Sequence, residues 1–184
     1  MEYIRIPLER VGVLVGKDGS FKSYLEERTG TRVDLNSDTG EVTITKVKDT
    51  GDPLSPWVAR DIVKAIGRGF SSEKACRLLN EGQTLRIIDL GSELGKSDSV
   101  LQRQRSRLIG KGGRTREIME QTTRCDISIM GRTVSIMGDD EEIAAAQEAI
   151  EMIIRGVPHS IVYRFLERKS SDLKQRDKEM WRKA

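Results

Sequence analysis

The chain has 184 residues, of which 36% are hydrophobic and 33% are charged. This length allows one large domain or two small ones, each with a modest core. The formal net charge is only +3, so total charge does not by itself indicate the partner. Cys76 and Cys125 lie far apart and the start carries no signal-like apolar stretch, which argues against a disulfide-rich secreted scaffold. No run of the sequence approaches the ~20 apolar residues that a membrane span needs. We therefore expect a cytoplasmic protein with no membrane-spanning segment.

The first predicted element is a half-buried strand, since Ile4, Ile6 and Leu8 alternate with other residues. A helical turn and a glycine-containing loop at 16–19 come next. The later elements are a helix at Ser20–Arg28, strands at Thr31–Leu35 and Glu41–Val47, a long helix from Ser55, and a short helix at Glu73–Leu79. Ser55 is placed to cap the long helix, with Pro56 at its first position and Val58, Ile62 and Ile66 at four-residue steps.

The same pattern then recurs, because Val15–Gly19 reappears as Ile109–Gly113, 94 residues later. The predicted elements of this copy are a short apolar strand around Leu85 and Ile87, a helical turn before the loop, a helix at Arg114–Thr122, strands at Asp126–Met130 and Thr133–Met137, a helix from Asp139, and a short helix at Ile161–Leu166. The apolar face of the helix from Asp139 consists of Ile143, Ala146, Ile150, Ile153 and Ile154. Each copy therefore reads β-α-α-β-β-α, which predicts an α+β protein with two three-stranded sheets covered by helices, plus extra C-terminal helices. The expected domains are 1–80, 81–158 and a basic helix or tail at 159–184.

The loop Gly110-Lys111-Gly112-Gly113 is the main candidate binding feature. Glycines let the chain turn sharply and bring bare backbone amides close to a sugar-phosphate strand. The following helix adds its positive N-terminal end, while Lys111 and Arg114 supply cationic donors to phosphate. From Arg103 to Arg116 there are six basic residues and no acid. This segment is therefore the most positive window of the chain.

Bases are expected to lie in an aliphatic groove beside this loop. Its predicted lining is Leu108, Ile109, Ile118, Ile127 and Ile129. The chain has only eight Phe, Trp or Tyr residues, and none lies between residues 71 and 162. Base stacking on aromatic platforms is therefore not the expected mode, which disfavours an RRM or an OB-fold.

The run from Arg107 to Thr115 resembles the signature of a type I KH domain, whose loop clamps about four nucleotides. The chain resembles the partner-of-Nob family over nearly its whole length. The resemblance rests on the two such units, on the run Arg-Leu-Ile-Gly-Lys-Gly-Gly-Arg and on the later sequence Ile-Arg-Gly-Val-Pro-His. This resemblance implies a ribosome-assembly factor that binds precursor small-subunit rRNA near its 3′ end and cooperates with the Nob endonuclease. A first strand that begins almost at Met1 is similar to the shorter archaeal form.

The expected RNA-binding residues lie mainly in the second copy. They are Arg103, Arg105, Arg107, Ile109, Gly110, Lys111, Gly112, Gly113, Arg114, Arg116, Ile127 and Arg132. In the first copy, Gly16, Lys17, Asp18, Gly19 and Lys22 are weaker candidates. Asp18 puts a negative charge where phosphate should lie, with Glu9, Glu26 and Glu27 nearby in the sequence. The second copy is therefore expected to dominate affinity, and the first is left open between RNA contact and packing or protein contact.

Other chemistries find little support in the residues. The acidic run Asp139–Glu142 suits the start of a helix better than a metal site, and Glu142 is placed for a capping box. His159, the only histidine, lacks neighbouring ligands and is expected at a helix start. We expect no cofactor and no enzymatic activity. The tail after Lys169 is mixed in sign and is expected to form a solvated helix, with Trp181 as a possible partner contact. Two alternative functions remain, a scaffold that mainly binds proteins and an RNA-binding subunit of a degradation complex.

Overall fold

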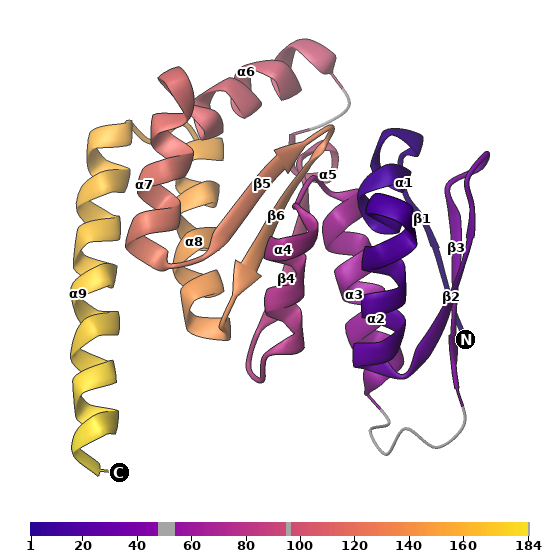
Figure 1. Ribbon diagram of the computed structural model, residues 1–184. Coiled ribbons are helices and arrows are strands. Elements are labelled where there is room, and N and C mark those ends of the chain that lie inside the picture. Colours follow the sequence, from indigo (N-terminus) through magenta and orange to yellow (C-terminus); the bar gives the residue numbers. More distant parts are fainter. Residues whose placement is uncertain (48–53, 95–96, 184) are drawn as a thin grey trace. The chain divides into compact units, whose positions relative to one another are not determined.

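The structure, a computed structural model, describes residues 1–47, 54–94 and 97–183. Its internal contacts divide the chain into two compact units, Met1–Leu85 and Arg86–Ala184. Each unit has a three-stranded sheet covered by helices (Figure 1), and the predicted order of elements is found in both, with one additional short helix in the second. The α+β fold class is therefore confirmed. None of the described helices combines the length and the apolar character that crossing a membrane requires.

The first unit begins with strand β1 and ends with a short helical segment. Its elements are β1 (Glu2–Arg5), α1 (Leu8–Val15), the 3₁₀ helix η1 (Lys17–Gly19), α2 (Ser20–Thr29), β2 (Thr31–Asn36), β3 (Glu41–Lys46), α3 (Ser55–Gly67), α4 (Ser72–Ala75) and η2 (Cys76–Leu79). The sheet order is β1-β3-β2, and Val33 pairs with Ile44. Helices α1, α2 and α3 lie on one face of this sheet (Figure 1). The other face stays polar, as the alternating burial of β2 requires.

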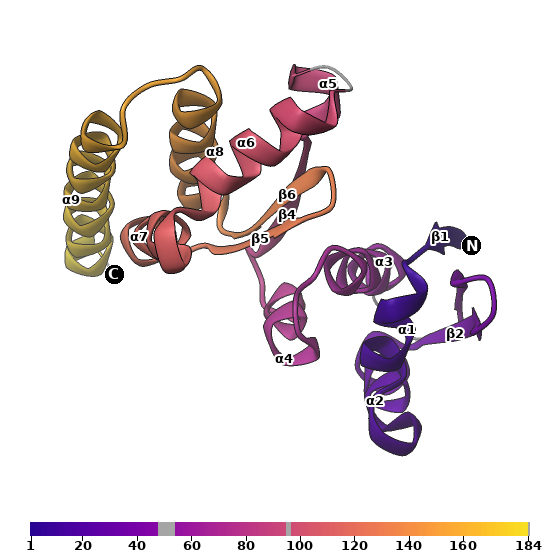
Figure 2. The same cartoon turned by 90° about the horizontal axis from the view of Figure 1, so that it is seen from above.

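The second unit repeats this plan, adds a short helix after its first strand and ends with a long helix. Its elements are β4 (Thr84–Asp89), α5 (Leu90–Leu94), α6 (Asp98–Ile109), the 3₁₀ helix η3 (Lys111–Gly113), α7 (Arg114–Thr123), β5 (Asp126–Met130), β6 (Thr133–Gly138), α8 (Asp140–Ile154) and α9 (His159–Lys183). The sheet order is β4-β6-β5, which makes β5 an edge strand. Helix α9 runs alongside α7 and α8 (Figures 1 and 2).

Helix α8 shows how the sequence pattern becomes a packed core. Its predicted face is confirmed, because Ile150 and Ile153 are fully buried, Ile143 is nearly so, and Ile154 is half-buried. Burying one such side chain contributes roughly 1.5–3 kcal/mol. At its start, Asp139 Oδ1 accepts from the Glu142 amide at 2.8 Å, and Glu142 Oε2 accepts from the Asp139 amide at 3.2 Å. The acidic run is therefore a capping box, as the sequence predicted.

Several predicted boundaries are wrong in ways that have physical causes. Ser55 does not cap α3, because Leu54 already has nearly helical dihedral angles and takes the N-cap position itself. Loop 110–113 is preceded by the twelve-residue helix α6 and not by a helical turn. The short helix predicted at Glu73–Leu79 is divided between α4 and η2.

The C-terminal helix is also longer and better packed than predicted. His159 begins α9, as expected, but the helix extends to Lys183. Val162 and Leu166 are fully buried and Leu173 is only 9% exposed. The helix is therefore not simply solvated after Lys169, because its apolar residues continue at helical spacing. The side chain of Trp181 lies outside the described residues.

Candidate nucleic-acid interface

The loop of the second unit reverses the chain between α6 and α7. Gly110 has φ 75° and ψ 173°, Gly112 has φ 59°, and Gly113 has φ 82°. A Cβ atom at position 110 would lie 2.3 Å from Thr115 Oγ1 and 2.7 Å from the Thr115 nitrogen, whereas at position 112 it would meet nothing within 4 Å. Gly110 is thus required by close packing as well as by its positive φ, while Gly112 leaves an open surface.

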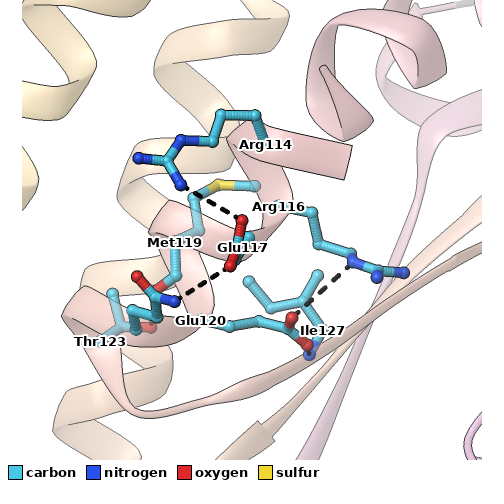
Figure 3. Close-up of polar contacts among 8 residues, drawn as sticks. Arg114, Arg116, Glu117, Met119, Glu120, Thr123 and Ile127 are labelled. Carbon is cyan, nitrogen blue, oxygen red and sulfur yellow. Dashed lines mark hydrogen bonds and ion pairs between the residues drawn. The ribbon is translucent and has the colours of Figure 1, made fainter. Parts of the chain in front are cut away.

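The exposed end of this loop has the features of an anion-binding site. Lys111 and Gly112 are exposed, and Gly113 at the N-cap of α7 offers no side chain to cover the first amides of the helix. Arg114 follows directly with its side chain 67% exposed and forms an ion pair with Glu117 at 3.4 Å (Figure 3). A surface pair of this kind contributes only ~0–1 kcal/mol. Arg114 can therefore exchange Glu117 for a phosphate at little cost.

Arg107 was predicted to bind RNA, but the structure gives its guanidinium another role. Nη1 donates to the Ile153 carbonyl at 2.7 Å, and Nη2 donates to the Val157 carbonyl at 2.9 Å. The Ile153 carbonyl lies in the last turn of α8, where a cation also complements the helix dipole, and the Val157 carbonyl lies just after the helix. The first unit has a similar tie from a different helix position: Arg10, six residues before Gly16, donates to the carbonyls of Ile66 and Phe70, whereas Arg107 lies three residues before Gly110. Arg107 therefore links α6 to the end of α8, and an RNA contact by this residue stays a prediction.

The other predicted cations differ in how far their side chains are exposed. Arg103 is exposed on α6, and Arg116 has 47% of its side chain exposed. Arg105 is half-buried, with its Nε atom removed from solvent. Arg132, in the turn between β5 and β6, lies against α5, because a Cβ on Gly91 would be 2.7 Å from its Nη2 atom. The loop cluster proper therefore consists of Lys111, Arg114 and Arg116.

The predicted aliphatic groove is only partly present at the surface. Leu108 is fully buried and Ile127 is 3% exposed, and both belong to the core of the second unit. Ile127 therefore offers RNA little side-chain surface, because periodicity identifies a face but not a depth, and its contact with RNA stays a prediction. Ile109, Ile118 and Ile129 are half-buried and keep part of their apolar surface accessible.

A carboxylate beside the edge strand was missed by sequence reasoning. Glu120 Oε1 accepts from the Ile127 amide of β5 at 2.9 Å, and Oε2 lies 3.7 Å from Arg116 Nε (Figure 3). The first unit repeats both contacts: Glu26 Oε1 accepts from the Val33 amide at 2.7 Å and lies 3.8 Å from Lys22 Nζ. The signal in the sequence was a cation, an acid four residues later and an apolar residue seven beyond that, at matching positions of both copies. This acid fixes the helix after each loop to the edge of its sheet.

The loop of the first unit has nearly the same backbone but different charges. Gly16 has φ 73°, and a Cβ there would lie 2.7 Å from Phe21 Cβ. Asp18 holds φ 52° and is exposed next to the exposed Lys17. Lys22 is half-buried and paired with Glu26. The geometry of a phosphate-binding loop is therefore retained, while the positive charge available to a phosphate is smaller.

Comparisons with known proteins agree with this architecture. Residues 84–171 match the family described as eukaryotic-type KH domain (KH-domain type I), and residues 1–55 match the KH-domain family. A KH domain-containing protein of Methanocaldococcus jannaschii is 41% identical over 183 residues, which cover all of this chain and 80% of the relative. The pre-rRNA-processing protein pno1 of Emericella nidulans is 31% identical over 177 residues, covering 94% of this chain and 68% of the relative.

A solved structure is also closely similar. It is the complex of a/eIF2alpha, aDim2p and rRNA from Pyrococcus horikoshii, in which the matching chain is 50% identical with a TM-score of 0.87, covering 93% of this chain and 94% of that one. Together with the two KH matches and the coverage of the relatives, these identities establish kinship and not fold alone. The chain belongs to the partner-of-Nob family, the Pno1 and Dim2 group of ribosome-assembly proteins with two KH domains.

Proposed function

We propose that this protein binds precursor small-subunit rRNA near its 3′ end through the loop of the second unit and aids maturation of that rRNA in the cytoplasm. The observation that carries the proposal is the exposed Lys111–Gly113 turn at the start of α7, followed by the exposed Arg114. Backbone amides and cations there face a sugar-phosphate strand. The half-buried Ile109, Ile118 and Ile129 offer apolar surface to its bases. The rRNA bound by the relative from Pyrococcus horikoshii supports this assignment.

The protein partner in this proposal is a Nob-type endonuclease. Family membership motivates this partner, because a factor that holds single-stranded rRNA beside its 3′ end can present the cleavage site to a nuclease. A second candidate function is a scaffold that mainly binds proteins, and the presence of a/eIF2alpha in the complex of the Pyrococcus horikoshii relative favours it. The two functions differ in whether partner binding requires the RNA loop.

The decisive experiment compares two variants that create the same loop sequence in different units. Lys111→Asp combined with Gly112→Asp gives Gly-Asp-Asp-Gly in the second unit, and Lys17→Asp alone gives it in the first. Both are expected to fold, since Asp18 already holds φ 52° at the position that corresponds to Gly112. The probe is a short single-stranded RNA with the 3′-terminal sequence of archaeal small-subunit rRNA, measured by fluorescence anisotropy.

The second-unit variant changes the local charge by −3. Each unit charge ~6 Å from a phosphate contributes roughly 0.7 kcal/mol in water, so binding should weaken by about 2 kcal/mol, or roughly thirtyfold. Lys17→Asp should change the Kd by less than about threefold, because the first loop already carries Asp18. Unchanged affinity in the second-unit variant would refute the proposal. Capture of the endonuclease by this variant after nuclease treatment, at wild-type yield, would favour the scaffold.

A further inference from the structure

Thr115 connects the loop of the second unit to the C-terminal helix. The residue is 3% exposed and lies directly behind the loop, where its Oγ1 atom occupies the space that a Cβ on Gly110 would need. That same Oγ1 atom shares a hydrogen bond of 3.0 Å with the hydroxyl of Tyr163 on α9. The side of the loop that faces away from solvent is therefore held by a residue 48 positions further along the chain.

A second contact from α9 reaches the chain just before the loop. His159 Nε2 lies 2.9 Å from the Arg107 carbonyl, and since a carbonyl oxygen only accepts, Nε2 must carry the proton. The guanidinium of Arg107 in turn donates to the Val157 carbonyl, two residues before His159. The rings of His159 and Tyr163 lie one helical turn apart, with centroids separated by 6.0 Å. One turn of α9 thus contacts the chain on both sides of residues 110–113.

The first unit differs at the corresponding place. Phe21 stands where Thr115 stands in the second unit, and a phenyl ring has no hydroxyl with which to form such a bond. The helical segment after α3 consists only of α4 and η2, eight residues in all, whereas α9 spans 25 residues. The hydroxyl pair is therefore an addition to the repeated fold and not a requirement of it.

We infer that Tyr163 and His159 are positioning residues that preorganise the RNA-binding loop of the second unit, so that the C-terminal helix contributes to RNA affinity without touching RNA. A loop that is already ordered loses less conformational entropy when it binds. The positive φ angles at Gly110, Gly112 and Gly113 make an unsupported loop costly to order. This inference rests on the proposed RNA-binding function.

The test removes single hydroxyl groups and leaves the side-chain shapes almost unchanged. Tyr163→Phe, Thr115→Val and the double variant are compared with Tyr3→Phe, a matched control at an exposed tyrosine of the first unit. A net hydrogen bond corresponds to roughly two- to tenfold in an equilibrium constant, so Tyr163→Phe should raise the Kd for the 3′-terminal rRNA probe about three- to tenfold. In the double variant the two effects should not add, because both changes delete the same bond.

Amide hydrogen exchange provides a readout that is independent of RNA. Exchange at residues 111–113 should accelerate in Tyr163→Phe, while the far-UV circular dichroism and the melting temperature of the variant stay close to the wild type. Wild-type exchange in this loop, or faster exchange with an unchanged Kd, would overturn the inference while RNA binding itself stands. If the wild-type protein bound no RNA, the proposed function would fail, and the positioning role in affinity would fail with it, whatever the exchange rates.

Discussion

The role of Arg107 leads to the sharpest prediction, because sequence and structure assign it differently. Replacing Arg107 by Met keeps much of the side-chain length but removes both hydrogen bonds to the Ile153 and Val157 carbonyls. A hydrogen bond to a charged group contributes roughly 1.5–3 kcal/mol. Arg107 is half-buried, so the lower part of that range applies to each bond. We expect a loss of about 3–4 kcal/mol in the free energy of unfolding of the second unit.

The assay is urea unfolding followed by circular dichroism, together with RNA binding measured below the unfolding transition. Arg114→Met serves as the matched control, because its side chain is 67% exposed and its ion pair with Glu117 lies within the same helix. This variant should unfold like the wild type within about 0.5 kcal/mol, yet bind the rRNA probe roughly fivefold more weakly. Arg107→Met should show the opposite combination, a large loss of stability with nearly normal affinity in the folded protein.

A reversed result would refute this reasoning. If Arg107→Met unfolds at the wild-type urea concentration but loses RNA affinity, its guanidinium binds phosphate and the carbonyl contacts contribute little. The corresponding variant of the first unit, Arg10→Met, supplies an internal check. It loses the equivalent bonds to the Ile66 and Phe70 carbonyls and should destabilise the first unit without affecting RNA bound through the second.

Three further predictions concern single properties of the chain. Gly110→Ala should destabilise the second unit far more than Gly112→Ala, which should cost only about 1 kcal/mol for its positive φ; thermal unfolding of both variants checks this. The logarithm of the RNA association constant should fall linearly with the logarithm of the salt concentration, with a slope near −2. Each cation that neutralises a phosphate of a single strand contributes about −0.7 to this slope, and the loop has three such cations. Burial, reinforced by the nearby carboxylate of Glu73, raises the pKa of the Cys76 thiol, so at pH 8 Cys76 should be alkylated by iodoacetamide more slowly than free cysteine; equal rates would contradict this.

Local patterns predicted most of the elements of this fold. Hydrophobic periodicity and the duplicated loop gave the order of strands and helices in both units, and β5 has the predicted ends. The capping box of α8 could be recognised in the sequence because its two partners are three residues apart. Periodicity and capping both depend on residues a few positions apart, so both can be recognised in the sequence alone.

The differences between prediction and structure at the site share another property, since they depend on contacts between distant segments. In the sequence, Arg107 is one of several cations in a basic run. Its hydrogen bonds to carbonyls 46 and 50 residues later are known only from the folded structure. Ile127 has the same pattern as Ile129, but only packing shows that one is in the core and the other is half-buried. The link from Thr115 to Tyr163 also joins two segments that no periodicity relates.

Comparing the two units within one chain separates the framework from the binding surface. The arginine tie to the closing helix and the glutamate tie to the edge strand occur in both units, so neither can explain why one loop should bind RNA better. The backbone angles of the two loops also agree, with φ 73° at Gly16 and 75° at Gly110. The differences include three positions at the loop and its support: Asp18 in place of Gly112, Ser20 in place of Arg114, and Phe21 in place of Thr115 with its bond to α9. Because a repeated framework cannot produce an asymmetric function, any difference in RNA affinity between the units must arise outside that framework, and these loop positions carry the difference in charge.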